Sequence, residues 1–324
     1  MLTGTAFALA AGLMWGLVFV APLLLPQYPP LLLSFGRYLA FGLIALALAG
    51  FDRRGLATLS RADWIEALKL SVVGNLLYYL CLAGGIQRAG GPLPTMIIGT
   101  LPVVIALVSN RRDAQRDGRL PWGRLAPTLG LIAAGIGLVN LGELSALRAA
   151  GEVDMGRYLS GALLTLGAVA CWTWYPLRNA DWLRAHADRS PITWATAQGL
   201  AILPLAAAGY AAWLAWEAAT GPGFELPFGP LPWRFLGLMA SLGLLASWLG
   251  TLCWNEASQR LPTTLVGQLI VFETLAALAY AFVLRGSPPP ATTLAGIVLL
   301  VAGVFWALRI RPEPPLAAAE GPPH

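Results

Sequence analysis

One acidic residue, Glu273, lies near the middle of a long apolar segment, residues 262–284. A charged side chain at the centre of a membrane helix costs about 2.5–3.5 kcal/mol on insertion scales, so a carboxylate there is a candidate functional group. Its chemistry would be that of a proton carrier, or of an anion that binds the ammonium group of a solute. The alternative is a protonated or hydrogen-bonded glutamate that packs between helices.

Arg37 is the basic counterpart, about two turns inside the apolar segment 30–50. A guanidinium group could bind the carboxylate of a solute. The preferred interpretation is structural: a side chain that reaches back to the external interface, or that pairs with a backbone carbonyl in the bundle. Glu273 and Arg37 are therefore assigned together as coupling or structural residues.

Polar and aromatic side chains, with Leu82 beside them, recur at three- and four-residue steps in four apolar segments, as one face of a helix requires. These residues are Asn75, Tyr78, Tyr79 and Leu82; Trp172 and Tyr175; Ser247, Thr251, Trp254 and Ser258; and Thr264, Gln268 and Phe272. Polar atoms in lipid need partners, so these faces should point into the bundle or a cavity.

These faces, with two further tryptophans deep in apolar segments, predict a site for a small amphipathic solute. The substrate-binding candidates are Trp15, Asn75, Tyr78, Tyr79, Trp172, Tyr175, Trp248, Trp254 and Gln268. Packing and hydrogen bonding between helices is the alternative for each of them.

Two prolines, Pro94 and Pro102, interrupt the apolar segment 92–109. A proline removes a backbone donor and can bend a helix. Either could therefore act as the hinge of a gating motion, and a static kink is the alternative for each.

No pattern in the apolar segments fits an enzyme, a metal or a cofactor. Metal and serine–histidine chemistry need a histidine in the site, but His186 lies in a polar loop and His324 is the last residue. An aspartyl mechanism needs paired carboxylates, and Glu273 stands alone. The phosphate-binding pattern G-x4-G-K-[ST] is absent, so we expect no direct drive by ATP.

The fold class follows from composition. Of 324 residues, 57% are hydrophobic and 11% charged, where a soluble domain carries about 25% charged residues. Crossing a bilayer takes about 20 apolar residues. Ten windows of that length can be marked, at 3–25, 30–50, 64–86, 92–109, 125–143, 158–178, 191–216, 233–256, 262–284 and 291–310. Because unpaired backbone groups are costly in lipid, we predict an all-α polytopic membrane protein of ten transmembrane helices.

The 21 Lys and Arg residues indicate the orientation. Most lie in the alternate loops on the side of the N-terminus, which predicts that both termini are cytoplasmic. They form no stripe of the kind that binds a phosphate backbone, so we expect no nucleic-acid partner. The Pro- and Ala-rich residues 312–324 predict a disordered cytoplasmic tail.

The two halves of the chain match weakly, helix by helix. Leu80-Cys81-x5-Gln87-Arg88 recurs as Leu252-Cys253-x5-Gln259-Arg260, and the spacing of Gly4 and Trp15 recurs in Gly161 and Trp172. Because five is odd, the second half would enter the membrane from the opposite side, and such inverted repeats can turn a central site towards either face. We predict five-helix repeats at 1–145 and 146–311.

The runs Gly12-Leu13-Met14-Trp15-Gly16, Pro30 to Arg37 and Leu101-Pro102 resemble the drug/metabolite transporter superfamily, in particular its ten-helix EamA-type exporters. The resemblance covers nearly all of residues 1–310 and is greatest to bacterial aromatic amino-acid exporters. Phe272-Glu273 stands where that family's second repeat usually has Glu-Pro, with Thr274 in place of the proline. The resemblance implies a basket of ten helices around a central cavity, in a bacterial inner (plasma) membrane.

Residues and resemblance together predict a monomeric exporter of small amphipathic metabolites, aromatic or other neutral amino acids first among them, that works by alternating access. Export of drugs or other small metabolites is the alternative. An intramembrane enzyme lacks a catalytic set, and a membrane scaffold would need larger loops. A channel would need a ring of repeated polar groups. The expected partners are a small-molecule substrate and the lipid bilayer.

Overall fold

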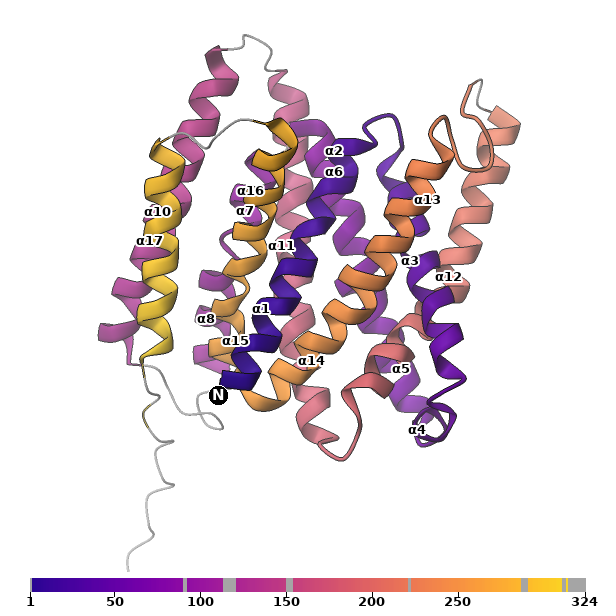
Figure 1. Ribbon diagram of the computed structural model, residues 1–324, viewed down its shortest axis with the longest axis horizontal. Helices are drawn as coiled ribbons and strands as arrows, with labels where there is room; N and C mark the ends of the chain where they lie inside the picture. Colours follow the sequence, from indigo (N-terminus) through magenta and orange to yellow (C-terminus); the bar gives the residue numbers. More distant parts are fainter. Residues whose placement is uncertain are drawn as a thin grey trace, which may run out of the picture.

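The computed structural model describes residues 2–89, 92–112, 121–149, 154–220, 223–286, 291–310 and 313, and its secondary-structure elements are helices (Figure 1). The predicted all-α class is therefore confirmed for these residues. The segment 312–324, predicted as a tail, lies outside the described residues except for Glu313.

The helices of the first half are α1 (Leu2–Gly16), the 3-10 helix η1 (Leu17–Phe19), α2 (Val20–Leu24), α3 (Pro30–Ala49), α4 (Arg53–Ala57), α5 (Arg61–Leu70), the π-helix η2 (Ser71–Leu77), α6 (Tyr78–Ala89), α7 (Pro92–Ile98), α8 (Leu101–Arg112) and α10 (Trp122–Ala149). Those of the second half are α11 (Met155–Ala185), α12 (Pro191–Thr220), α13 (Pro232–Ser241), the π-helix η3 (Leu242–Leu249), α14 (Gly250–Arg260), α15 (Thr263–Leu269), α16 (Val271–Arg285) and α17 (Ala291–Leu308).

Six helical rods in the described residues are long and apolar enough to cross a membrane. They are Leu2–Leu24, Pro30–Ala49, Arg61–Ala89, Pro191–Thr220, Pro232–Arg260 and Leu265–Leu284, and each coincides with a predicted window. Helices also occupy the other predicted windows, and Ala291–Ala307 is a shorter apolar helix. Such a chain is built to pass the bilayer several times.

The helices of the two halves pack against each other in pairs. α3 lies along α12, α8 along α15, and α10 along α17, while α6 packs on α11 and α1 packs on both α14 and α16. The pair of α10 and α17 stands at one side of the bundle (Figure 1). The core therefore lies at the seam between residues distant in sequence.

Glycines bring α1 close to α16. A Cβ atom added to Gly12 would lie 3.1 Å from the backbone nitrogen of Glu273, and one added to Gly16 would lie 2.9 Å from that of Ala277. The Gly12-x3-Gly16 motif thus serves packing within the chain, and it places α1 directly on the turn that carries Glu273.

Two of the long helices widen into π-helix at their middle, which the sequence analysis did not foresee. Residues 71–77 in the rod α5–η2–α6 and residues 242–249 in the rod α13–η3–α14 take this form. The face of Asn75 and Tyr78, predicted from α-helical spacing, therefore straddles the end of a π-helical turn. π-Helical turns are rare and often lie at functional sites.

The prolines of the segment 92–112 begin helices and do not bend one. Pro94 lies in the first turn of α7 and Pro102 in the first turn of α8, where a missing N–H group leaves no gap in the hydrogen-bond ladder. The backbone changes direction between the two helices, at Gly99 and Thr100. The bend predicted within one helix is thus a break between two, because Pro102 has no N–H group to donate to the carbonyl of Ile98.

Candidate functional site

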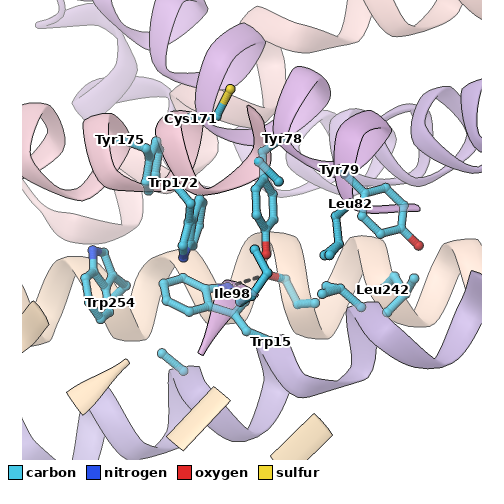
Figure 2. Close-up of a cluster of buried hydrophobic side chains, with 14 of the residues drawn as sticks. Trp15, Tyr78, Tyr79, Leu82, Ile98, Cys171, Trp172, Tyr175, Leu242 and Trp254 are labelled. Atoms are coloured by element: carbon cyan, nitrogen blue, oxygen red, sulfur yellow. Dashed lines mark hydrogen bonds between the residues drawn. The ribbon is translucent and has the colours of Figure 1, made fainter. Parts of the chain in front are cut away.

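Five aromatic rings from four rods meet near the middle of the bundle, and we call them the aromatic cluster (Figure 2). They are Trp15, Tyr78, Trp172, Tyr175 and Trp254. The ring of Trp172 is stacked between Tyr78, at 4.7 Å, and Tyr175, at 4.9 Å. Trp15 meets Trp172 edge-on at 4.9 Å and lies 5.0 Å from Trp254. These rings come from α1, α6, α11 and α14, so the cluster joins both halves of the chain.

Trp15 is held in place by the π-helical segment opposite it. Its indole N–H donates to the carbonyl of Ala246 in η3 at 2.9 Å. A Cβ atom at Gly250 would lie 2.7 Å from the indole nitrogen of Trp15, so only glycine leaves room for the ring. The backbone of η3 thus supplies the acceptor for Trp15 of α1, and the glycine of α14 supplies the room for its ring.

Arg37 is buried between the halves, with 3% of its surface exposed. Its Nε donates to Ser247 Oγ at 3.0 Å. The guanidinium carbon lies 4.6 Å from the ring centre of Tyr79 and 5.0 Å from that of Tyr38, within the range of cation–π attraction. The side chain therefore does not reach back to an interface, which removes one of the two structural interpretations.

Glu273 is 1% exposed and lies in the first turn of α16. The hydroxyl group of Tyr78 donates to its Oε1 atom at 3.2 Å. Tyr78 thus joins the carboxylate to the stacked ring of Trp172. A carboxylate with few partners in an apolar bundle is costly when charged.

The two charged groups and Asn75 line one small space beside the aromatic cluster, together with Trp15, Val18, Tyr38, Tyr78 and Trp172. Arg37 Nη1, Asn75 Nδ2 and Glu273 Oε2 are buried without a hydrogen-bond partner among the described residues. The space measures about 10 Å³, which is room for about one water molecule. An open central cavity was expected; here the aromatic rings fill it, so the site is closed to a solute.

Not every predicted residue joins this centre. Trp248 is half-buried and donates to Thr196 Oγ1 on α12 at 3.2 Å. Tyr79 faces Arg37 and Tyr38 rather than the stacked rings. The side chain of Gln268 lies outside the described part of the structure.

Sequence reasoning missed a network of buried amides next to the aromatic cluster. Asn179 Oδ1 accepts from Trp194 Nε1 at 2.8 Å and from Gln198 Nε2 at 3.3 Å, while Asn179 Nδ2 donates to Asn255 Oδ1 at 2.8 Å. Tyr175 donates to Gln198 Oε1 at 3.0 Å and so joins the network to the cluster. The sequence offered one signal for this network, because Asn179, Gln198 and Asn255 each lie inside or directly beside an apolar window.

The comparisons with known proteins agree with this architecture. Residues 2–110 match the model of the EamA-like transporter family. The chain is 54% identical to the Escherichia coli (strain K12) inner membrane protein YtfF over 316 residues, which cover 98% of each protein. A solved crystal structure shares the fold with a TM-score of 0.67 at 18% identity, over 94% of this chain and 96% of the other.

The two sequence matches cover different lengths of the chain. The family model covers α1 to α8, whereas the relative covers nearly the whole chain at high identity. Neither the family description nor the name of the relative states a solute. Together they indicate a membrane transporter, and they do not identify its substrate. The chain belongs to the EamA-like transporter family and is a multi-pass membrane transporter of small molecules.

Proposed function

We propose that this protein exports small amphipathic metabolites, aromatic or other neutral amino acids first among them, by alternating access through the space beside the aromatic cluster. The observation that carries the proposal is the presence of a buried cation and a buried anion on one aromatic-walled space. Arg37 and Glu273 each keep one polar atom without a partner there. Such atoms are expensive to bury unless a ligand supplies what they lack.

An amino acid has the matching groups. Its carboxylate would accept from Arg37 Nη1 and Asn75 Nδ2, and its ammonium would donate to Glu273 Oε2. Its side chain would lie against Trp15, Tyr78 or Trp172, where stacking adds about 0.5–1.5 kcal/mol to the burial of the ring. The three polar atoms and the three rings line the same space.

Access requires the two halves of the chain to move, and several features support inverted repeats at 1–145 and 146–311. In the predicted repeats, α6 corresponds to α14 and α11 corresponds to α1. The contact of α6 with α11 therefore has a counterpart in the contact of α14 with α1. The third predicted span of each half carries a central π-helix, η2 or η3. Both halves would then contribute five spans, ten in all.

The fourth span of each half is broken as well, between α7 and α8 and between α15 and α16. A rocking motion would concentrate at such breaks, and we assign the hinge in the first half to the turn that precedes Pro102. Pro94 and Pro102 would then keep the two short helices separate. Solute would enter from one face and leave by the other.

The two ends of the chain lie at the same end of the bundle, since α1 begins and α17 ends there (Figure 1). With the excess of basic residues on that side, this favours cytoplasmic termini. The name of the Escherichia coli relative supports the inner membrane as the location. The protein would work there as a monomer, because each chain contains its own central site.

The test is counterflow into liposomes that contain the purified protein. Vesicles loaded with unlabelled L-phenylalanine should take up external labelled L-phenylalanine faster than vesicles without protein. A panel of neutral, acidic and basic amino acids then defines the class. Uptake that does not exceed the protein-free control for any amino acid, with exchange of a cationic aromatic drug, would assign the alternative function.

Two variants test the roles of the charged groups. Arg37→Gln should reduce amino-acid exchange by more than tenfold, since a hydrogen bond to a charged group is worth about 1.5–3 kcal/mol. Ser247→Ala, which removes only the neighbour of Arg37, is the matched control and should retain most activity. Glu273→Gln should abolish any dependence of uptake on a pH gradient; unchanged rate and unchanged pH dependence would remove Glu273 from the mechanism.

A further inference from the structure

A second small space, closed even to a water molecule in this structure, lies beyond Trp254 at the end of the bundle where α1 begins. It is enclosed by α8, α11, α14 and α15, and Trp254, Ser258, Thr263, Ala180 and Gly267 are among the residues that line it. Ser258 and Thr263 flank the turn at Leu261, and Leu261 packs against Gly4 near the start of the chain. The space therefore lies between the aromatic cluster and the end that carries the N-terminus.

Two residues that line this space each carry a polar atom that is buried without a partner among the described residues. These atoms are the indole nitrogen of Trp254, on a side chain that is 1% exposed, and Thr263 Oγ1, on a side chain that is 4% exposed. Both donate hydrogen bonds, and an unpaired buried donor costs about 1–3 kcal/mol. The surrounding small side chains of Ala180, Ser258 and Gly267 would leave room once the helices separate.

The other flank of α11 at this end is built in the opposite way. The polar atoms of Asn179 are paired with Trp194, Gln198 and Asn255, and Ser71 donates to the carbonyl of Gln198 at 2.9 Å. Opening the bundle there would break several satisfied hydrogen bonds. Asn255 lies on α14 beside Trp254, so the network also holds α11 to α14, and opening at Trp254 would move α8 and α15 away from that pair. Among the described residues, that movement would break no hydrogen bond of the Trp254 N–H or of Thr263 Oγ1.

We infer that the route between the central space and the N-terminal end passes through the seam of α8, α11, α14 and α15, with Trp254 as its gate. Trp254 touches Trp15, which lines the central space, and itself lines the second space. The inference rests on the proposed function in that the same solute passes both spaces.

The second space also has a chemistry of its own. The Trp254 N–H can only donate, and the Thr263 hydroxyl can donate to the same acceptor. Neither is charged, and the described residues that line the space include no charged one. This subsite would take the carboxylate of an amino acid during passage, weakly enough to release it to Arg37, because a neutral donor binds a carboxylate less strongly than a guanidinium does.

The route is tested by cysteine labelling. In a protein with Cys81, Cys171 and Cys253 changed to serine, Ser258→Cys should react with a membrane-impermeant methanethiosulfonate reagent from the face that carries the N-terminus. Adding Trp254→Ala should raise the labelling rate by about tenfold or more. Ser71→Cys is the matched control on the other flank of α11; it is equally buried and should stay unreactive. Faster labelling at Ser71→Cys than at Ser258→Cys, or labelling that Trp254→Ala leaves unchanged, would overturn the route.

The subsite is tested separately with labelled L-phenylalanine. Trp254→Phe keeps the ring and removes the donor, and Thr263→Val keeps the shape and removes the hydroxyl. Each should raise the half-saturation concentration for counterflow by about three- to tenfold, with a smaller change in maximal rate. An unchanged half-saturation concentration in both variants would refute the subsite. If no amino acid is exchanged while the labelling pattern holds, the proposed solute is wrong and the route stands.

Discussion

The two ends of the bundle are closed by different kinds of contact. At the end that carries the N-terminus, the amides of Asn179, Gln198 and Asn255 form a buried network, and Trp182 donates to Asp63 Oδ1 at 2.8 Å. At the opposite end, Tyr28 connects the turn before α3 to the segment 223–231 and to α13. Its ring stacks on Phe235 at 5.1 Å and its hydroxyl group binds the backbone of the segment 223–231.

The difference concerns how each end could open. The buried amides satisfy one another from three helices, so separating those helices would leave several polar groups unpaired at once. The contacts of Tyr28 are local, and water can replace them at a membrane surface. We therefore expect the end closed by Tyr28 to open more readily in the resting protein, while the other end opens along the Trp254 seam.

The largest effect is expected when the amide network is cut. Asn179→Leu would leave Trp194 Nε1 without an acceptor and would remove partners from Gln198 and Asn255. The variant should lose about 3 kcal/mol of stability, given about 1–3 kcal/mol for each polar group left unpaired. The measurement is the midpoint of thermal unfolding in detergent. A midpoint equal to that of the parent protein would show that the network does not hold this end closed.

A smaller effect is expected at the opposite end. Tyr28→Phe keeps the ring stack on Phe235 and removes the hydrogen bonds to Phe228 and Leu231. We expect a loss of about 1–2 kcal/mol, together with faster labelling of Ser34→Cys from that face in a protein without native cysteines. Tyr210→Phe, which removes one hydrogen bond to Pro227 in the same segment, is the control and should change less. Equal losses of stability in Tyr28→Phe and Asn179→Leu would show that the two ends are held closed equally strongly.

The smallest effect is expected for the ion pair between Glu66 and Arg178, which lies towards the N-terminal end. Arg178 is about half exposed and forms two hydrogen bonds to the carboxylate. Glu66 itself is buried, but the half-exposed Arg178 keeps the pair in contact with solvent, which screens it. Glu66→Gln should therefore cost less than about 1 kcal/mol, and the loss should shrink as salt is added. A larger loss that salt does not change would place this pair among the contacts that close the end.

The regions that sequence reasoning described well are those governed by local chemistry. The apolar windows predicted helices because a backbone in lipid must satisfy its own hydrogen bonds. Six of the ten windows coincide with rods long and apolar enough to cross a membrane. The deep positions of Trp15, Trp172, Trp248 and Trp254 were predicted from their distance from the ends of the apolar segments. Three of these tryptophans meet in the aromatic cluster, and Trp248 does not. The π-helical turns and the amide partners of Asn179 were not predicted, because both depend on contacts between distant segments.

Length, hydropathy and spacing act within each helix, so they were enough to predict a helical membrane protein with a few polar groups deep in its apolar segments. Which of these groups meet depends on the packing of the fold. Arg37 contacts Ser247 and Tyr79, and Glu273 accepts a hydrogen bond from Tyr78. Aromatic rings fill the space that Arg37 and Glu273 both line. A polar atom in lipid needs a hydrogen-bond partner, and the identity of that partner depends on how helices far apart in the chain pack.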